Sequence, residues 1–355
     1  MVVKGEKCMI TGGLGFLGKN LVERLLRRGA HVRVLDLRLP ATEIEETFKR
    51  LASDFGGKVE FFAGDLTKKD DCLLAVDGMD VIFHCASPSP ALQNKKIFYA
   101  VNVGGTTNLL EACGEKGITR FVHTSSASVI YEGKSYEYGD EASLPYAANP
   151  MDYYTETKIL AEKIVLESNG SNGVMTVAIR PHGLFGPHDP LLVPTLVDTC
   201  KSGKMKFIIG NGDNLVDFTY IGNVCQSLEL CADKLQKGSP VCGNAYFITN
   251  AEPVKFWDFT GDVLEGLGYP RPSIHLPASL LFFVAYILLG ITRLLELFGK
   301  TYTPTFTPSR IALTSTHHYY SCEKAKRELG YEPEVSMKEG MRQTLASFDY
   351  LRKDN

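Results

Sequence analysis

The sequence lacks the residue spacings that mark common metal sites. Its nine cysteines include no C-x-x-C pair, and its eight histidines form no H-E-x-x-H motif. Both patterns bring two metal ligands together, so we expect no metal site. Because the cysteines are odd in number and scattered singly, we expect most of them to be small core residues in a reducing compartment.

Basic clusters and an apolar leader are also missing. No block of Lys or Arg occurs and the net charge is −3, so we expect no nucleic acid partner. The opening MVVKGEKCMI contains no apolar stretch, so we expect no cleaved signal peptide. Charge is absent altogether from residues 276–292 (LPASLLFFVAYILLGIT), although the composition is otherwise that of an ordinary globular protein.

Short apolar runs alternate with helical patterns through the first half of the chain. The runs KCMITGG, HVRVLDL, VEFFAGD, DVIFHCA, RFVHTSS and VMTVAIR predict buried strands, and residues 101–113 and 153–167 predict helices between them. This alternation predicts an α/β fold with a doubly wound parallel sheet of the Rossmann type. We expect the sheet domain over residues 1–190 and a smaller substrate-binding lobe, interleaved with it, over residues 191–355.

The first predicted strand ends in a glycine-rich turn, TGGLGFLG. Gly12, Gly15 and Gly18 follow the spacing G-x-x-G-x-x-G, a relative of the dinucleotide fingerprint. Small residues let the backbone approach a pyrophosphate, whose charge meets N–H groups at a helix start. Asp36, 18 residues after Gly18, can accept hydrogen bonds from a ribose and repels a 2′-phosphate. The pattern predicts NAD as the cofactor, although the nearby Arg38 keeps NADP open.

The stretch DYYTETK opens one of the predicted helices. Residues four apart share a helix face, so Tyr154 faces Lys158 and Tyr153 does not. A tyrosine pKa near 10 is roughly three units too high for a base at neutral pH, a gap of about 4 kcal/mol. A lysine ammonium ~4 Å away supplies about that much, and an oxidised nicotinamide adds to it. The spacing predicts that Tyr154 takes an alcohol proton while hydride leaves for NAD⁺, with a nearby serine hydroxyl bonding the reacting oxygen.

Together these motifs resemble the extended short-chain dehydrogenase/reductase family. TGGLGFLG, HCAS, VNVGGTTN, TSSAS, YTETK, RPHGLFGP and LGYEP carry the resemblance over nearly the whole chain. It implies Tyr154 as catalytic acid/base, Lys158 as its partner and Ser126 as the third member, with Ser125 as runner-up. A structural role for Asn102, capping or bending its helix, stays open beside a cofactor role. The residues implied to contact the cofactor, besides the loop glycines and Asp36, are Phe16, Leu17, Asp65, Leu66, Ala86, Asn102, Tyr154, Lys158 and Pro181.

The substrate is predicted from a departure from the family pattern. Nucleotide-sugar epimerases of this family carry an arginine before the Asp-Phe of an RDF segment. Here Val216 precedes Asp217, and Asn223 stands where those relatives often have Asp. Losing this phosphate donor disfavours a UDP-sugar and favours an apolar substrate. HCASPSP, SSASVIYEG, DYYTETKILAE, RPHGLFGPHDP and TPSRIAL are similar to the decarboxylating 3β-hydroxysteroid dehydrogenases of sterol biosynthesis.

That resemblance implies NAD-dependent oxidation of the 3β-hydroxyl of a 4α-carboxysterol. The resulting ketone lies β to the carboxylate, and such an acid loses CO₂ through its enol without a metal. Arg310, Lys95 and Lys96 are unranked candidates for pairing with the carboxylate. Two alternatives stay open: a 3β-hydroxy-Δ5-steroid dehydrogenase/isomerase, which needs a second acid/base, and a non-enzymatic NAD-sensing protein, which would normally lack Tyr154 and Lys158 in register.

The charge-free segment is used to predict the cellular location of the protein. Its 17 residues are at the bottom of the range needed to span ~30 Å of hydrocarbon. A true span would place residues 301–355 across the membrane from the sheet domain. Their LGYEP motif, however, packs with the rest of the fold in the family. A buried core helix is the other alternative. We expect a monotopic helix at about 276–299 in a membrane surface, on the cytosolic face of the endoplasmic reticulum or on lipid droplets. A homodimer is left open.

Overall fold

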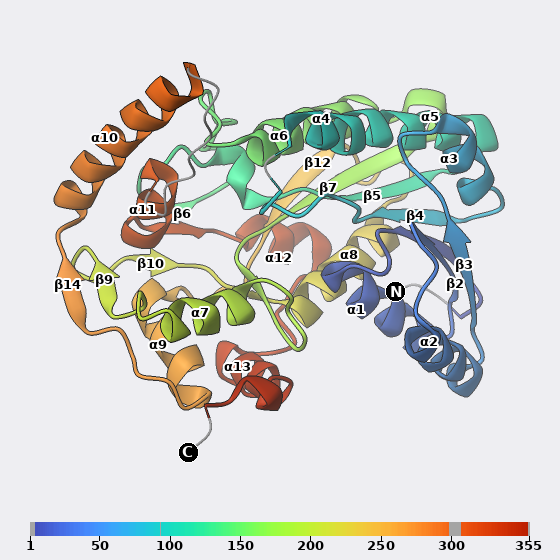
Figure 1. Cartoon of the computed structure of the whole chain (residues 1–355). Helices are drawn as coiled ribbons and strands as arrows, with labels where there is room; N and C mark the ends of the chain where they lie inside the picture. Colours follow the sequence, from blue (N-terminus) through green and yellow to red (C-terminus); the bar gives the residue numbers. More distant parts are fainter. Residues whose placement is uncertain (1–3, 93, 298–306, 354–355) are drawn as a thin grey trace.

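The computed structural model describes residues 4–92, 94–297 and 307–353 (Figure 1). Its centre is a seven-stranded, all-parallel sheet of order β12-β7-β5-β4-β1-β2-β3. The strands are β1 (Lys7–Thr11), β2 (His31–Asp36), β3 (Lys58–Ala63), β4 (Val81–His84), β5 (Arg120–Thr124), β7 (Met175–Pro181) and β12 (Asn244–Ile248). The direction of strand order changes between β1 and β4, which is where such sheets bind ligands. The predicted doubly wound parallel sheet is confirmed.

Helices cover both faces of this sheet (Figure 1). One face carries α1 (Phe16–Arg27), α2 (Thr42–Phe55) and α8 (Ile221–Lys234). The other carries α3 (Lys69–Val76), α4 (Lys95–Phe98), the π-helical turn η1 (Tyr99–Gly105), α5 (Thr106–Lys116) and α6 (Tyr153–Glu167). Because both faces are covered, β1, β4, β5, β7 and β12 are continuously buried after at most one residue, whereas β2 and β3 at one side of the sheet are not.

The rest of the chain forms a smaller part beside the sheet. A four-stranded sheet of order β13-β10-β15-β6 contains β6 (Tyr136–Gly139), β10 (Leu215–Val216), β13 (Val254–Lys255) and β15 (His318–Tyr320). Short pairs join β8 (Leu184–Phe185) to β11 (Thr219–Tyr220) and β9 (Phe207–Ile209) to β14 (Ile274–Leu276). The helices are α7 (Leu192–Lys201), α9 (Phe256–Gly266), α10 (Ala278–Leu297), α11 (Pro308–Ser315), α12 (Glu323–Leu329) and α13 (Met337–Ala346). β6 precedes residue 190 but belongs to this four-stranded sheet, and β12 follows residue 190 but belongs to the central sheet. Neither sheet is therefore formed entirely from one side of residue 190.

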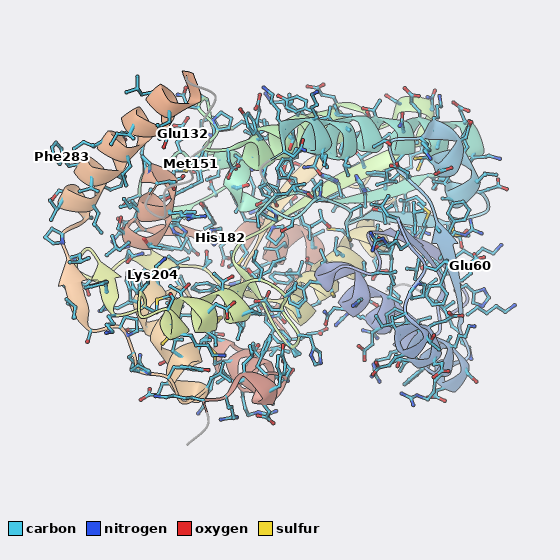
Figure 2. All side chains as sticks on the ribbon, in the orientation of Figure 1. Glu60, Glu132, Met151, His182, Lys204 and Phe283 are labelled. Carbon is cyan, nitrogen blue, oxygen red and sulfur yellow. The ribbon has the colours of Figure 1, made fainter. Side chains whose placement is uncertain are left out.

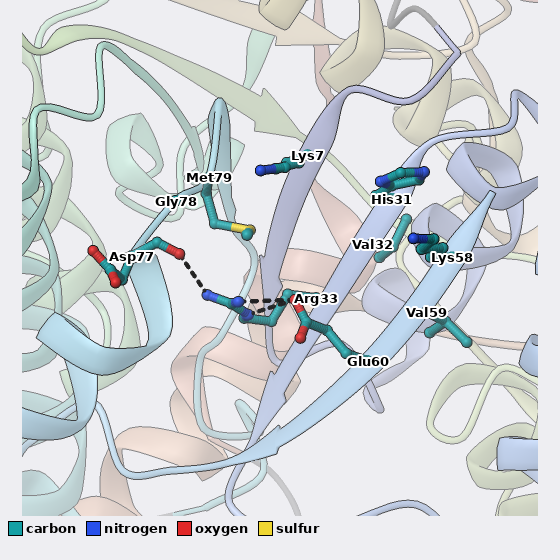
Figure 3. Close-up of a pocket in the computed structure, with 10 residues that line it drawn as sticks. All are labelled: Lys7, His31, Val32, Arg33, Lys58, Val59, Glu60, Asp77, Gly78 and Met79. Atoms are coloured by element: carbon teal, nitrogen blue, oxygen red, sulfur yellow. Dashed lines mark hydrogen bonds and ion pairs between the residues drawn. The ribbon is translucent and has the colours of Figure 1, made fainter.

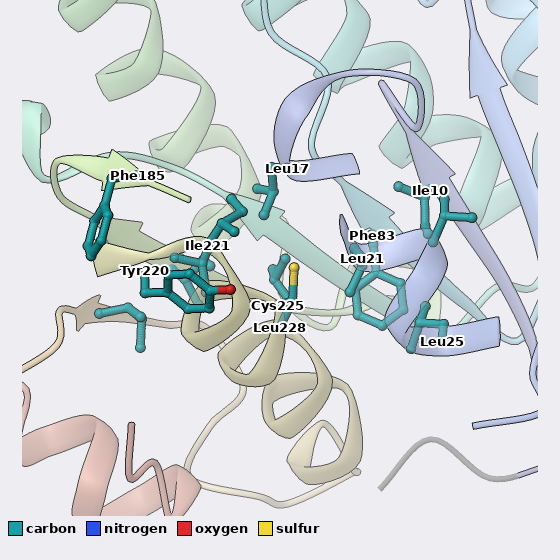
Figure 4. Close-up of a cluster of buried hydrophobic side chains, with 14 of the residues drawn as sticks. Ile10, Leu17, Leu21, Leu25, Phe83, Phe185, Tyr220, Ile221, Cys225 and Leu228 are labelled. Carbon is teal, nitrogen blue, oxygen red and sulfur yellow. The ribbon is translucent and has the colours of Figure 1, made fainter. Parts of the chain in front are cut away.

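One large apolar core lies between the central sheet, α1 and α8 (Figure 4). Leu21 and Leu25 of α1 and Phe83 of β4 have no exposed surface, and they pack in the same cluster as Cys225 and Leu228 of α8. Each fully buried large apolar side chain contributes roughly 1.5–3 kcal/mol. The helix α1, which follows the glycine-rich turn, is therefore held in place by a well-packed core.

The helix α10 contains most of the charge-free segment. Leu281 and Ala285 are buried in a small cluster with Ile311 of α11. Phe283, by contrast, is 65% exposed and lies on the outer side of the helix (Figure 2), so α10 is not a buried core helix. The other large apolar side chains exposed on it are Leu280, Val284, Tyr286, Ile287, Ile291 and Leu294. Among the described residues, no helix is both long and apolar enough to cross a membrane. Residues 298–299 of the predicted segment lie outside the described part.

Candidate active site

The glycine-rich turn between β1 and α1 has no room for side chains at two positions. Gly12 has a φ of +64°, and a Cβ atom there would lie 2.8 Å from the Cα of Ala86. A Cβ atom at Gly18 would lie 2.1 Å from the carbonyl oxygen of Gly12. Gly15, the N-cap of α1, donates its N–H to that oxygen at 2.9 Å. The glycines leave the backbone accessible where α1 begins. The first N–H groups of α1 have no partner within the helix, so the turn suits a pyrophosphate.

A cleft of about 660 Å³ opens at this turn. It lies along the carboxyl ends of β1 to β4, across the point where the strand order changes direction. Its volume is typical of a small-molecule site. The predicted cofactor residues that line it are Gly12, Gly15, Phe16, Leu17, Gly18, Asp36, Asp65, Leu66 and Ala86. The structure thus brings together the residues predicted from four separate segments.

Asp36 both lines the cleft and stabilises the glycine-rich turn. The Leu14 N–H donates to its Oδ2 at 3.0 Å, and the Leu37 N–H donates to its Oδ1 at 2.8 Å. Each carboxylate oxygen retains a lone pair, so a ribose hydroxyl can still donate to it. Arg38 is exposed, two residues further on.

Hydrogen bonds also fix the wall of the cleft beyond β3 and β4. Asp65 Oδ1 accepts two hydrogen bonds from Thr67, one from its N–H and one from its hydroxyl. Leu66 is buried, and its carbonyl oxygen accepts from Asn108 Nδ2 at 2.9 Å. The Ala86 N–H donates to Thr11 Oγ1 at 3.1 Å. These three predicted positions are therefore held in place by the fold.

The predicted catalytic residues meet where α6 begins beside the end of β5. Asp152 caps the helix through its Oδ1, which accepts a backbone N–H of the first turn at 2.7 Å. Tyr154 is half-buried, and the hydroxyl of Ser126 lies near its own. Lys158, one turn later, is 3% exposed and donates from Nζ to the carbonyl oxygen of Thr124 at 2.7 Å. The structure brings the tyrosine, the lysine and Ser126 together.

The neighbouring serine has a different environment. Ser125 pairs its N–H with the carbonyl oxygen of Ile179 on β7 at 2.8 Å, and its Oγ is buried without a partner among the described residues. Ser126 also accepts from the Ser128 N–H, as N-cap of the 3₁₀ turn Ala127–Ile130. Of the two serines, Ser126 is the one whose hydroxyl affects the pKa of the tyrosine, which it lowers against the larger raising by burial.

Burial dominates the ionisation of the tyrosine and the lysine. It raises the pKa of Tyr154 to about 12, against a smaller lowering by the Ser126 hydroxyl. It lowers the pKa of Lys158 to about 8. The expected lowering of the tyrosine pKa by Lys158 is therefore wrong for this structure, in which the ammonium is bonded to Thr124. The spacing predicted a shared face but could not predict the burial.

Two buried histidines lie behind this pair. His84 Nδ1 is 2.7 Å from Thr11 Oγ1, and its Nε2 is 2.9 Å from Thr106 Oγ1. Burial lowers the pKa of His84 to about 3 and that of His123 well below its usual value, and Lys158 adds to both shifts. Both rings are therefore neutral at neutral pH, and the positive charge in this part of the site is that of Lys158.

Four of the predicted cofactor residues are not part of the cleft lining: Tyr154, Lys158, Asn102 and Pro181. Asn102 is buried in η1, where its Nδ2 donates to Thr157 Oγ1 at 3.0 Å and so links η1 to α6. Its Oδ1 has no partner in the described ranges. Pro181 is buried at the end of β7, where it pairs with Ile248 of β12. The contacts of Asn102 fit the structural role left open for it.

The sequence offered three cations for a substrate carboxylate: Lys95, Lys96 and Arg310. Lys95 has its Nζ 5.0 Å from the centre of the Tyr153 ring, at the start of the catalytic helix. Phe98, one turn further along α4, has its ring centre 6.0 Å from that of Tyr154. All three cations are exposed, two of them on α4 and one on α11. The contacts of α4 therefore favour Lys95 among the three.

Several residues of the cleft were not singled out from the sequence. They follow β4, in the segment SPSPAL, and continue into α4 and η1: Ser87, Pro88, Ser89, Leu92, Ile97 and Val101. A signal was present, because turn residues after a strand end lie at the edge where such sheets bind ligands.

A second pocket, of about 360 Å³, lies at the opposite edge of the sheet (Figure 3). Lys7, His31 and Lys58 each begin a strand there, and Arg33 pairs with Glu60 at 2.8 Å. Ligands of doubly wound sheets bind at the carboxyl ends of the strands. This pocket is therefore separate from the predicted catalytic edge.

The chain is similar to known proteins over nearly its whole length. The profile of the "3-beta hydroxysteroid dehydrogenase/isomerase family" matches residues 9–278. "Sterol-4-alpha-carboxylate 3-dehydrogenase, decarboxylating" of Mus musculus is 46% identical, covering 99% of this chain and 94% of its own. A "3 beta-hydroxysteroid dehydrogenase/Delta 5-->4-isomerase" of Mycobacterium tuberculosis is 37% identical, covering 96% and 89%. The structure of UDP-glucuronic acid 4-epimerase from Bacillus cereus in complex with NAD shares the fold, with a TM-score of 0.72 at 21% identity over 98% of this chain and 100% of that one. The chain belongs to the 3-beta hydroxysteroid dehydrogenase/isomerase family.

Proposed function

We propose that the protein is an NAD-dependent 3β-hydroxysteroid dehydrogenase of sterol biosynthesis that oxidises and decarboxylates a 4α-carboxysterol. The observation that carries the proposal is that Tyr154, Ser126 and Lys158 come together where α6 begins beside the end of β5, with Tyr154 and Lys158 one turn apart on that helix. A tyrosine and a serine hydroxyl that lie near each other can both bond one substrate oxygen. The mouse relative, 46% identical, supports the choice of a 4-carboxysterol among steroid alcohols.

The residues of the cleft fit a dinucleotide. The glycine-rich turn and the backbone at the start of α1 would hold its pyrophosphate, because Gly12 and Gly18 leave no room for a Cβ atom. Asp36 would accept hydrogen bonds from the adenosine ribose and would repel a 2′-phosphate, which favours NAD over NADP. When bound, the oxidised cofactor supplies the hydride acceptor and a positive charge.

Tyr154 would take the proton of the 3β-hydroxyl while Ser126 donates a hydrogen bond to the same oxygen. The pKa of Tyr154 is about 12, so it has to fall in the loaded site. A nearby positive charge favours the tyrosinate, and the oxidised cofactor supplies one when it is bound. Lys158 would reach the nicotinamide ribose.

The proton that Tyr154 takes can be returned to the substrate. Loss of CO₂ from the β-keto acid leaves an enolate whose oxygen is the former hydroxyl oxygen. Tyr154, now protonated, can donate to that oxygen, and the enol becomes a ketone when its proton moves to C4. The hydroxyl proton therefore ends on the sterol, and no metal is needed to balance the reaction.

Incubation with NAD⁺ and a 4α-carboxysterol tests this function, with NADH and CO₂ followed together. Equal amounts of the two are expected. NADH without CO₂, together with a shifted double bond when a Δ5-steroid is supplied, would instead indicate a dehydrogenase/isomerase. No NADH from either steroid would contradict both activities and favour an NAD-sensing protein.

We further propose that α10, within the segment at about 276–299, attaches the protein to the cytosolic surface of the endoplasmic reticulum or of lipid droplets. The support is the row of large apolar side chains exposed on this helix, while Leu281 and Ala285 pack it against α11. A sterol that is insoluble in water could then enter from the lipid.

A further inference from the structure

The face of α6 that carries Tyr154 and Lys158 continues to Glu162. The three residues are four apart, so they lie in a row along one side of the helix. Glu162 has no exposed surface. A carboxylate is almost never buried completely unless it is paired, and none of the proposed chemical steps uses this one.

Glu162 is paired with Arg180 of β7. Arg180 Nε lies 3.1 Å from each carboxylate oxygen, and Nη2 lies 2.7 Å from Oε1. The Tyr146 hydroxyl donates to Oε1 at 2.7 Å. The guanidinium is 5.3 Å from the ring centres of both Tyr146 and Phe247. This two-pronged pair, packed between aromatic rings, fixes both the distance and the angle between α6 and β7.

The pair lies beside the strands that end at the catalytic edge. Arg180 directly precedes Pro181, and β7 pairs with β5 through Ile179 and Thr124. The carbonyl oxygen of Thr124 is also the acceptor for Lys158. The helix that carries the catalytic residues is therefore bonded to this pair of strands through Lys158 and through the buried ion pair, and also by a hydrogen bond from Thr176 to Val165.

The groups facing Lys158 come from three elements. His84 and Cys85 lie at the end of β4, His123 is on β5, and Glu162 is on α6 itself. Burial, opposed by smaller contributions, raises the pKa of the Cys85 thiol to about 11, and both histidine rings are neutral at neutral pH. Among these groups Glu162 is the one with negative charge, and its field raises the pKa of Lys158 against the larger lowering by burial.

We propose that Glu162 is a positioning residue for the oxidation: its pair with Arg180 fixes α6 beside β7, and its charge keeps Lys158 protonated at the working pH. The inference rests on the proposed function, because it assigns Glu162 a role that acts through Lys158 and Tyr154. Arg180 from β7 and Tyr146 from the segment before α6 face the carboxylate directly.

The first test compares two buried ion pairs. Glu162→Gln removes the charge with little change of shape. Glu229→Gln is the matched control, because Glu229 is also buried, at 2% exposed, and forms an ion pair with Arg24 at 2.8 Å that links α8 to α1. In the plot of kcat against pH, the alkaline limb of Glu162→Gln should lie about one pH unit lower than that of wild type. The Glu229→Gln profile should match wild type, and Glu162→Asp, which keeps the charge, should restore the limb. An unmoved limb in Glu162→Gln, or an equal shift in the control, would overturn the proposal.

Glu162→Gln leaves Arg180 buried beside a neutral amide, and this variant could fail to fold for that reason. In that case the double variant Glu162→Gln with Arg180→Gln removes both charges and is expected to show the same downward direction of shift. A wild-type profile in a folded double variant would overturn the role of the charge.

A second measurement needs no substrate. The Tm values at pH 7 of wild type, Glu162→Gln, Lys158→Met and the variant that combines Glu162→Gln with Lys158→Met form a double-mutant cycle. Glu162→Gln should lower Tm less when Lys158 is already Met, because the attraction between the two charges is then gone. Zero coupling in an enzyme that oxidises sterols would reject the inference. Coupling in a protein that oxidises no sterol would instead reject the proposed function and leave the link between the two residues standing.

Discussion

The Nζ atom of Lys158 lies 2.7 Å from the carbonyl oxygen of Thr124, so the ammonium beside the candidate base is itself bonded to the end of β5. The side chain is 3% exposed, and burial lowers its pKa to about 8. Burying an ammonium opposes folding even when a carbonyl replaces part of its hydration. The position of this charge is therefore not explained by stability.

Replacing Lys158 with Met should change how stability depends on pH. The lysine titrates near 10.5 in the unfolded chain and at about 8 in the folded one, so between these values the unfolded state binds more protons. Wild-type stability therefore rises with pH across this window, and below pH 8 the full cost, on the order of 3 kcal/mol, is present. The variant lacks this dependence. Its Tm, relative to wild type, should change little up to about pH 8 and then fall from pH 8 to pH 10, and a constant difference over that range would contradict the burial of a charge.

Tyr154→Phe should lower NADH formation by about a hundredfold or more, because the proton of the alcohol loses its acceptor. NAD binding, measured by calorimetry, should remain nearly intact. The adjacent Tyr153 provides the control: it is 47% exposed and packs with Lys95 rather than with Ser126. Tyr153→Phe should change the rate little. Equal losses in the two variants would show that the wrong tyrosine has been assigned.

The sequence predicted the parts of this site that depend on local periodicity. Apolar runs marked the strands, and the four-residue spacing placed Tyr154 and Lys158 on one face of a helix that begins at Tyr153. Contacts between distant segments were not predictable in this way. The bond from Lys158 to Thr124 and the pairing of Glu162 with Arg180 depend on how α6 lies on the sheet. The rise in the tyrosine pKa likewise follows from burial, which spacing does not encode.

The preference between the two nicotinamide cofactors should depend on Asp36. Asp36→Asn keeps an acceptor for the Leu14 N–H but removes the charge, whereas Asp36→Ala removes both. Each variant should weaken NAD and shift the ratio of NAD to NADP affinity by about tenfold towards NADP, because repulsion of the 2′-phosphate is lost. Arg38→Ala should shift the ratio the other way. A wild-type preference for NADP would show that Arg38 outweighs the carboxylate.

The exposed face of α10 should bind lipid. Phe283 and Ile287 are 65% and 48% exposed, and each contributes roughly 1.5–3 kcal/mol when fully buried. Phe283→Glu combined with Ile287→Glu should therefore weaken co-sedimentation with phosphatidylcholine vesicles by about a hundredfold or more. Leu74, on α3, is also 65% exposed, so Leu74→Glu is the matched control and should sediment as wild type does. Deleting residues 280–289 should release the protein from membranes and impair turnover of insoluble sterols.

The orientation of this helix has its own test, because a helix lying in one leaflet leaves both ends of the chain on the same side. In sealed microsomes, protease should digest tags at the N-terminus and at the C-terminus equally. A protected C-terminal tag beside a digested N-terminal one would establish a span and contradict a surface helix. Loss of vesicle binding in Leu74→Glu as well would place the lipid contact outside α10. Digestion of both tags, with binding lost only on α10 substitution, is the result that surface attachment requires.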